Sequence, residues 1–179
     1  MLSMPLRSLA GFRITLAGMA VMMAGASAPS PFYPVLQQEI GFSPMALTGI
    51  FAVYTVALLA SLLIMGSLSD HVGRRPVISA GFVLMALSLL LFWQAQDVIG
   101  LVEARALQGV AAGLLLSALS AAVVDFEPSD RPGSASVWNS VVPLGGLATG
   151  ALVAGVLMDV TDMAKADVFG TLVAAYALL

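Results

Sequence analysis

Two long stretches without a charged side chain constrain this chain more than any other feature. Residues 40–69 contain no Asp, Glu, Lys or Arg, and neither do residues 76–96. A helix that crosses the ~30 Å hydrocarbon core of a bilayer needs about 20 apolar residues, so each stretch is long enough to span a membrane. The turn between them carries the adjacent Arg74 and Arg75. We therefore expect this turn to lie at a membrane surface.

The composition excludes several classes of protein. Of the 179 residues, 60% are hydrophobic and 9% charged, whereas soluble domains contain about 25% charged residues. The chain is therefore predicted to be an integral membrane protein. Its net charge of −3 and its lack of a basic cluster exclude a nucleic-acid binder. Because there is no cysteine and the single histidine, His71, lies in the turn, the sequence predicts neither an enzyme nor a metal site nor a cofactor.

The expected fold is all-α, a polytopic membrane helix bundle formed by one domain over residues 1–179. Its helices are predicted from apolar runs bounded by charged, Gly or Pro residues, at 14–38, 44–67, 76–95, 98–124, 134–158 and 167–179. Ser43 and Pro44 are a typical helix start. The last segment would extend only about 20 Å as a helix, so the sixth helix is expected to be incomplete.

The first apolar run has two interpretations. Arg7 and Arg13 precede it, and residues 26–28 read Ala-Ser-Ala, which resembles the end of a signal peptide. The run continues to Leu36, however, which favours a spanning helix. The prolines at positions 29, 31 and 34 would bend its outer half, because proline lacks the amide hydrogen of a helical bond.

Arginine placement predicts the orientation. With the N-terminus in the cytoplasm, five arginines fall inside and Lys165 alone falls outside, as the positive-inside rule requires. The reverse orientation violates that rule. We therefore expect a multi-pass protein of the plasma (inner) membrane with a cytoplasmic N-terminus.

Three motifs then resemble those of the major facilitator superfamily of secondary transporters. The turn after the second helix has the spacing of the family's cytoplasmic loop, with Gly66, Leu68, Asp70, Gly73, Arg74 and Arg75. The fourth helix carries its Arg-x-x-Gln-Gly pattern, with Leu101, Arg105, Gln108 and Gly109. The fifth helix partly matches the antiporter motif through Gly146, Gly150 and Gly155, with Ala151 and Ala154 in place of a proline and a glycine.

The resemblance implies a fold and a function. Each half of such a transporter has six helices, built as two inverted three-helix repeats, and this chain resembles the N-terminal half. It implies a drug:proton antiporter that exports a small molecule across the lipid bilayer and needs a C-terminal half or a second copy to complete the pathway. The alternative is a truncated or half-length membrane protein with a structural or assembly role.

Arg105 is the leading candidate for a role in substrate binding or proton coupling, with Gln108 and Gly109 on the same motif. A guanidinium within the membrane costs about 3 kcal/mol near the centre, so it should face the bundle interior or a water-filled cavity. The alternatives are snorkelling to the outer surface, or pairing with Glu103 or Asp97. Proton coupling needs a carboxylate within the membrane, and the sequence offers only Glu103, Asp97 and Asp70 near the surfaces.

The other two motifs each carry two interpretations. The loop motif is either a cytoplasmic latch, in which Asp70 contacts Arg74 or a facing helix, or a lipid anchor through its arginines. The small residues of the fifth helix form either a surface for close helix packing or a part of the gate. Three methionines of the first helix, Met19, Met22 and Met23, are candidates for an adaptable apolar lining.

Overall fold

The computed structural model describes residues 4–179, with side chains from Leu9 onward, and this part of the chain contains helices and no strand. The elements in chain order are α1 (Met4–Ser27), η1 (Ser30–Phe32), α2 (Tyr33–Ile40), α3 (Pro44–Met65), α4 (Leu68–Val72), α5 (Arg74–Gln94), α6 (Val98–Asp125), α7 (Ser134–Val160) and α8 (Ala164–Leu178). Within the described residues, five segments are long and apolar enough to cross a membrane. The predicted all-α membrane bundle is therefore confirmed.

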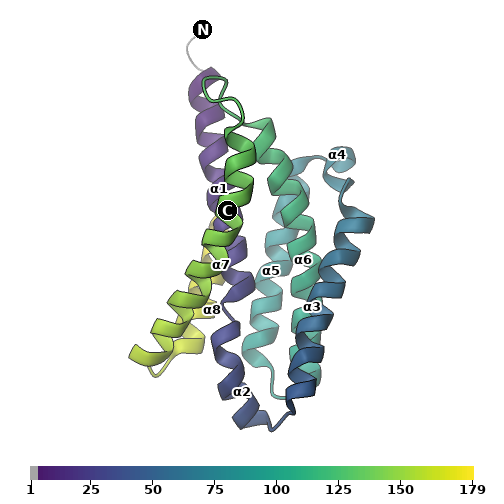
Figure 1. Cartoon of the computed structure of the whole chain (residues 1–179), viewed down its shortest axis with the longest axis vertical. Coiled ribbons are helices and arrows are strands. Elements are labelled where there is room, and N and C mark those ends of the chain that lie inside the picture. The colour runs from purple at the N-terminus through teal and green to yellow at the C-terminus, as the bar shows by residue number, and fades with distance from the viewer. Residues whose placement is uncertain (1–3) are drawn as a thin grey trace.

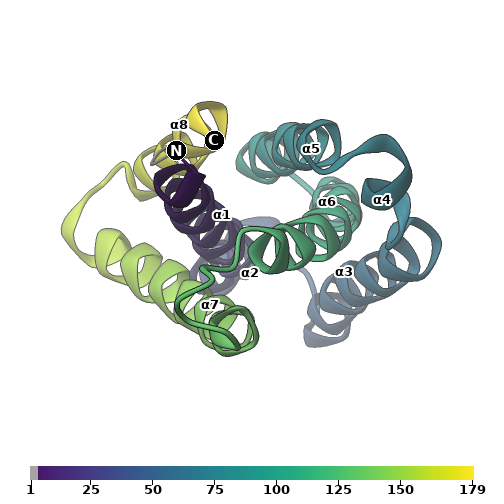
Figure 2. The ribbon, with the colours of Figure 1, turned by 90° about the horizontal axis from the view of Figure 1, so that it is seen from above.

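Two helices form the centre of the bundle. Helix α6 packs against α3, α5 and α1, while α1 also packs against α7 and α8. Seen from above, α1 and α6 stand between α3 on one side and α7 on the other, with α5 and α8 together along one edge (Figure 2). More than half of the most apolar window of α6 is buried, whereas less than a fifth of the corresponding window is buried in α3 and in α7. Helix α6 is thus the best-enclosed place for a polar side chain.

The first spanning segment differs most from its predicted form. A single helix over residues 14–38 is wrong, because α1 starts at Met4 and ends at Ser27, and the chain continues through the short η1 into α2. Pro29 and Pro31 have no amide hydrogen to donate to the preceding turn, which explains the break. Helix α1 starts earlier than predicted because hydropathy locates the apolar stretch and not the first residue of the helix. The Ala-Ser-Ala sequence of residues 26–28 is buried in the bundle.

The remaining helix ends lie within a few residues of their predicted positions. Ser43 caps α3 by accepting a hydrogen bond from the amide of Ala46 at 3.2 Å, as its position before Pro44 predicts. Asp97 caps α6 in the same way through Gly100. The largest addition is α4, a short helix inside the predicted charged turn.

Helix α8 is shorter than the other spanning helices. Its 15 residues extend about 22 Å at 1.5 Å per residue, less than the hydrocarbon core. Figure 1 shows the C-terminus part-way along the bundle. Tyr176 fixes this helix, because its ring packs against Phe82 and its hydroxyl donates a hydrogen bond to the carbonyl of Val21.

Candidate functional site

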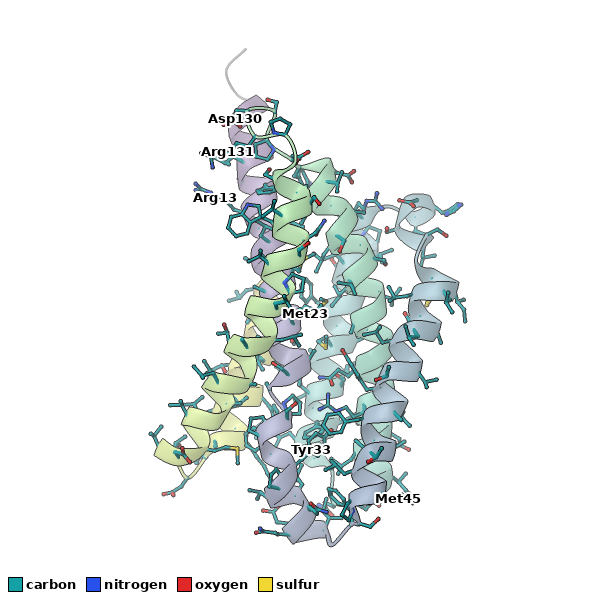
Figure 3. The ribbon with its side chains drawn as sticks, viewed as in Figure 1. Arg13, Met23, Tyr33, Met45, Asp130 and Arg131 are labelled. Carbon is teal, nitrogen blue, oxygen red and sulfur yellow. The ribbon has the colours of Figure 1, made fainter. Side chains whose placement is uncertain are left out.

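Arg105 lies in the interior of the bundle, enclosed by aromatic rings. Its side chain is 2% exposed, and four rings stand 5.2–5.6 Å from the central carbon of the guanidinium, those of Tyr33, Phe51, Tyr54 and Phe92. Aromatic faces attract a cation at such distances. Tyr33 is the first residue of α2, on the side of this segment next to α3 in Figure 3. The cage therefore joins the second half of the first spanning segment to α3, α5 and α6.

Hydrogen bonds tie Arg105 and Gln108 to the break after α1. The Nε of Arg105 donates to the hydroxyl of Tyr33 at 2.5 Å, and Nη1 donates to the carbonyl of Ala26 at 3.2 Å. Gln108 Nε2 donates to the carbonyl of Gly25 at 3.0 Å. Pro29 would be the helical donor to Gly25 and has no amide hydrogen, so the break leaves that acceptor open. The side chains of α6 therefore satisfy two carbonyls that the break after α1 leaves without a helical donor.

One nitrogen of the Arg105 guanidinium donates no hydrogen bond. Nη1 also donates to Oε1 of Gln108, but Nη2 is buried without a hydrogen-bond partner. Among the described side chains, no carboxylate forms an ion pair with Arg105. An unsatisfied buried donor costs about 1–3 kcal/mol and more when charged. The site is therefore a caged cation with an open hydrogen-bonding position.

The surface alternatives predicted for Arg105 do not match its position. Glu103 is exposed on another face of α6, and Asp97 accepts the capping bond of that helix. Neither carboxylate pairs with Arg105. Gly109 has no side chain to offer the site, and a Cβ placed there would be 2.4 Å from the carbonyl oxygen of Tyr54 in α3.

Gly109 belongs instead to a close helix contact that the sequence interpretation missed. A Cβ at Gly113 would stand 2.6 Å from Cβ of Ser61, and the Ser61 hydroxyl donates to the carbonyl of Val110 at 3.0 Å. Glycines four residues apart let two membrane helices approach closely. The Gly109-x-x-x-Gly113 spacing was the available signal.

The loop motif forms a polar cluster around Arg74. Its guanidinium donates to Asp70 of α4, to the hydroxyl of Ser69, and to Asp125 at the end of α6, the last at 3.0 Å. Gly73 has φ of +102°, a conformation that favours glycine. Asp125 was not among the predicted site residues, and only its position at the same end of the bundle could have indicated it.

The other members of the loop motif have simpler surroundings. Leu68 packs against the small apolar cluster formed by Val77, Leu114 and Ala118. Gly66 ends α3, and Arg75 is exposed on α5. Within this motif, Arg74 is therefore ion-paired, Arg75 is exposed and Leu68 packs in an apolar cluster.

Arg74→Ala is expected to lower the free energy of unfolding by about 1 kcal/mol, because ion pairs this exposed contribute little each and Arg74 makes two. Equilibrium unfolding in mixed micelles would measure the change. The matched control is Arg75→Ala, since Arg75 forms no ion pair among the described side chains. An equal loss in both variants would contradict a specific role for Arg74.

The small residues of α7 face α1. Gly146, Gly150 and Ala154 are buried, and a Cβ at Gly150 would lie 2.1 Å from the carbonyl oxygen of Ala24. Ala151 and Gly155 stand beside this row, and a Cβ at Gly155 would meet open space. Of the predicted fifth-helix motif, the row with a four-residue spacing therefore makes the close contact.

The methionines of α1 do not form a common lining. Met19 and Met22 are fully buried in the core, while Met23 is half-buried beside α7. Of Phe92 and Trp93, near the end of α5, Phe92 is buried and belongs to the cage. Trp93 alone remains 42% exposed.

Comparison with known proteins places these features in a family context. The family model described as Major Facilitator Superfamily matches residues 15–178. The puromycin resistance protein pur8 of Streptomyces alboniger is 31% identical over 85% of this chain and 30% of its own length. The inner membrane transport protein YnfM of Escherichia coli is 31% identical over 72% of the chain and 31% of its own length.

A third relative is the cephamycin export protein CmcT of Amycolatopsis lactamdurans, which is 32% identical over 70% of the chain and 26% of its own length. The chain thus spans about three-tenths of the length of these relatives.

Proposed function

This chain belongs to the Major Facilitator Superfamily, and on that basis we propose that it forms the N-terminal membrane half of an exporter of small, drug-like molecules. Membership in a family of transporters agrees with the expectation that it is not an enzyme. Transporters of this family bind substrate near the bilayer midplane, between two halves that rock against each other. The second half is a partner in this proposal.

The observation that carries the proposal is the unpaired Nη2 of Arg105 inside its aromatic cage. Charged groups within a membrane are rare and cluster at substrate and ion pathways. Here the cation donates three hydrogen bonds and keeps both N–H groups of Nη2 open, so it can donate to a further polar group without losing its present position. A small molecule with a hydrogen-bond acceptor beside an aromatic or apolar ring fits this chemistry.

The names of the relatives support the direction of transport. CmcT is named for the export of cephamycin, and pur8 is named for resistance to puromycin, which export of the compound would provide. Exporters of amphipathic compounds use adaptable apolar surfaces, and the rings of Phe51 and Tyr54 offer one at a partly exposed place on α3. We place puromycin-like amphipathic molecules first among candidate substrates.

We further propose the predicted location and orientation: the protein lies in the inner membrane, and its N-terminus lies in the cytoplasm. Arg13, Arg131 and the α4 segment lie at one end of the bundle (Figures 1 and 3). At the opposite end, Lys165 pairs with Glu39 at 3.0 Å. The positive-inside rule then assigns the arginine-bearing end to the cytoplasm. The Arg74 cluster acts there as a latch that holds α4 to α6.

Proton coupling completes the proposal. Asp70 is engaged by Arg74, Asp97 caps α6, and Glu103 is exposed. None of the three contacts Arg105. We therefore assign the coupling carboxylate to the second half, where it would face the caged cation.

Efflux from cells tests the function. The chain is co-produced with the six-helix C-terminal half of a relative, and puromycin retention is compared with cells that produce either half alone. We expect retention to fall only when both halves are present. Correct membrane insertion of both halves without any efflux across a panel of amphipathic compounds would contradict an exporter, and would favour a structural or assembly role.

A further inference from the structure

A groove opens at the arginine-bearing end of the bundle, between α1 and the start of α7. It has a volume of about 670 Å³. Leu9, Phe12 and Trp138 contribute to an apolar wall, and Arg13 and Arg131 stand at its rim. Figure 3 shows the two arginines at the same end of the molecule, one on α1 and one on the loop that leads to α7. The groove is therefore amphipathic, with guanidinium groups beside an apolar surface.

The acidic residues at the end of α6 and in the loop that follows it mostly have partners outside the groove. Asp125 pairs with Arg74 at 3.0 Å. Glu127 accepts a hydrogen bond from the amide of Ala135 at 2.8 Å and so caps the start of α7. Only Asp130 remains at the groove, with its carboxylate 3.7 Å from Arg131. Two guanidinium groups and one carboxylate leave one net positive charge.

We propose that this groove binds an anionic phospholipid, with its phosphate between Arg13 and Arg131 and an acyl chain along the apolar wall. Guanidinium groups match phosphate oxygens in geometry and charge. Trp138 is 43% exposed, and tryptophan favours the level of the lipid headgroups. One net positive charge near the surface corresponds to about a fivefold preference for anionic over zwitterionic lipid. This site lies apart from Arg105 and does not depend on the transport proposal.

The two tryptophans provide a direct test, because Trp138 lines the groove and Trp93 lies near the other end of the bundle. The chain carrying Trp93→Phe is placed in nanodiscs of phosphatidylcholine that contain a small fraction of brominated phosphatidylglycerol, and quenching of Trp138 fluorescence is recorded. The reference is the same fraction of brominated phosphatidylcholine. We expect about a fivefold stronger apparent association with the anionic lipid.

Substitutions at the rim move this preference in opposite directions. The double substitution Arg13→Gln with Arg131→Gln leaves only the Asp130 carboxylate at the groove and should reverse the preference, whereas Asp130→Asn should increase it severalfold. In the Trp138→Phe chain, Trp93 should show no preference. Inorganic phosphate added to the buffer should leave the quenching unchanged if the acyl chain is held as well, and relief by phosphate would mean a simple anion site. Equal quenching by both lipids, or a preference that survives the double substitution, would overturn the proposal.

Discussion

Gly150→Ala is expected to lower the free energy of unfolding by about 2–3 kcal/mol, the upper range for overpacking in a well-packed core. The new methyl group would lie 2.1 Å from the carbonyl oxygen and 2.5 Å from Cα of Ala24. Both are backbone atoms, so no rotamer change can relieve the contact, and α7 must move away from α1. Unfolding of the bundle by a denaturing detergent, followed by circular dichroism, measures the loss.

Gly145→Ala is the matched control, because a Cβ at Gly145 meets nothing within 4 Å. In a helix, alanine is favoured over glycine by up to about 1 kcal/mol, so this variant should be unchanged or slightly more stable. Gly146→Ala should resemble Gly150→Ala, since its Cβ would lie 2.6 Å from the carbonyl oxygen of Ala20. Equal stability of the 145 and 150 variants would refute close packing of α7 on α1.

Hydropathy predicted the architecture of the bundle because crossing a bilayer imposes a strict length on each apolar helix. That argument located the five spanning segments, the charged turn and the short last helix. It could not locate the break after Ser27, since prolines in a membrane helix either kink it or interrupt it, depending on what satisfies the freed carbonyls. Here the answer lies in Arg105 and Gln108, about 80 residues away in sequence.

The candidate site was predictable only in part for the same reason. A lone arginine in an apolar helix had to face the interior or a surface, and its cost in lipid favoured the interior. The cage needs Phe51 and Phe92, which are ordinary apolar residues in sequence and come together only when α3 and α5 pack against α6. The contact between Arg74 and Asp125 likewise depends on tertiary structure, because 51 positions separate the two residues.

Arg105→Met is expected to reduce transport by the two-half assembly about 100-fold, the effect of losing a charge-assisted hydrogen bond worth up to 3 kcal/mol. Met fills similar space without a donor, so no group can occupy the open position at Nη2. Arg105→Lys should also reduce transport, by about tenfold, because an ammonium cannot hydrogen-bond to Tyr33 and Gln108 and still direct a further N–H at the substrate. Initial rates of puromycin efflux, normalised to protein in the membrane, give the comparison.

Stability measurements separate this role from a purely structural one. If Arg105 served only to satisfy the carbonyl of Ala26, its loss would lower stability and transport together. Because the charge is buried without a carboxylate, however, removing it also removes a desolvation cost that offsets the lost hydrogen bonds. We therefore expect Arg105→Met to unfold close to wild type while transport collapses, and Glu103→Gln, on an exposed face of the same helix, to keep both. A folded Arg105→Met variant with normal efflux would show that the caged cation does not contact the substrate.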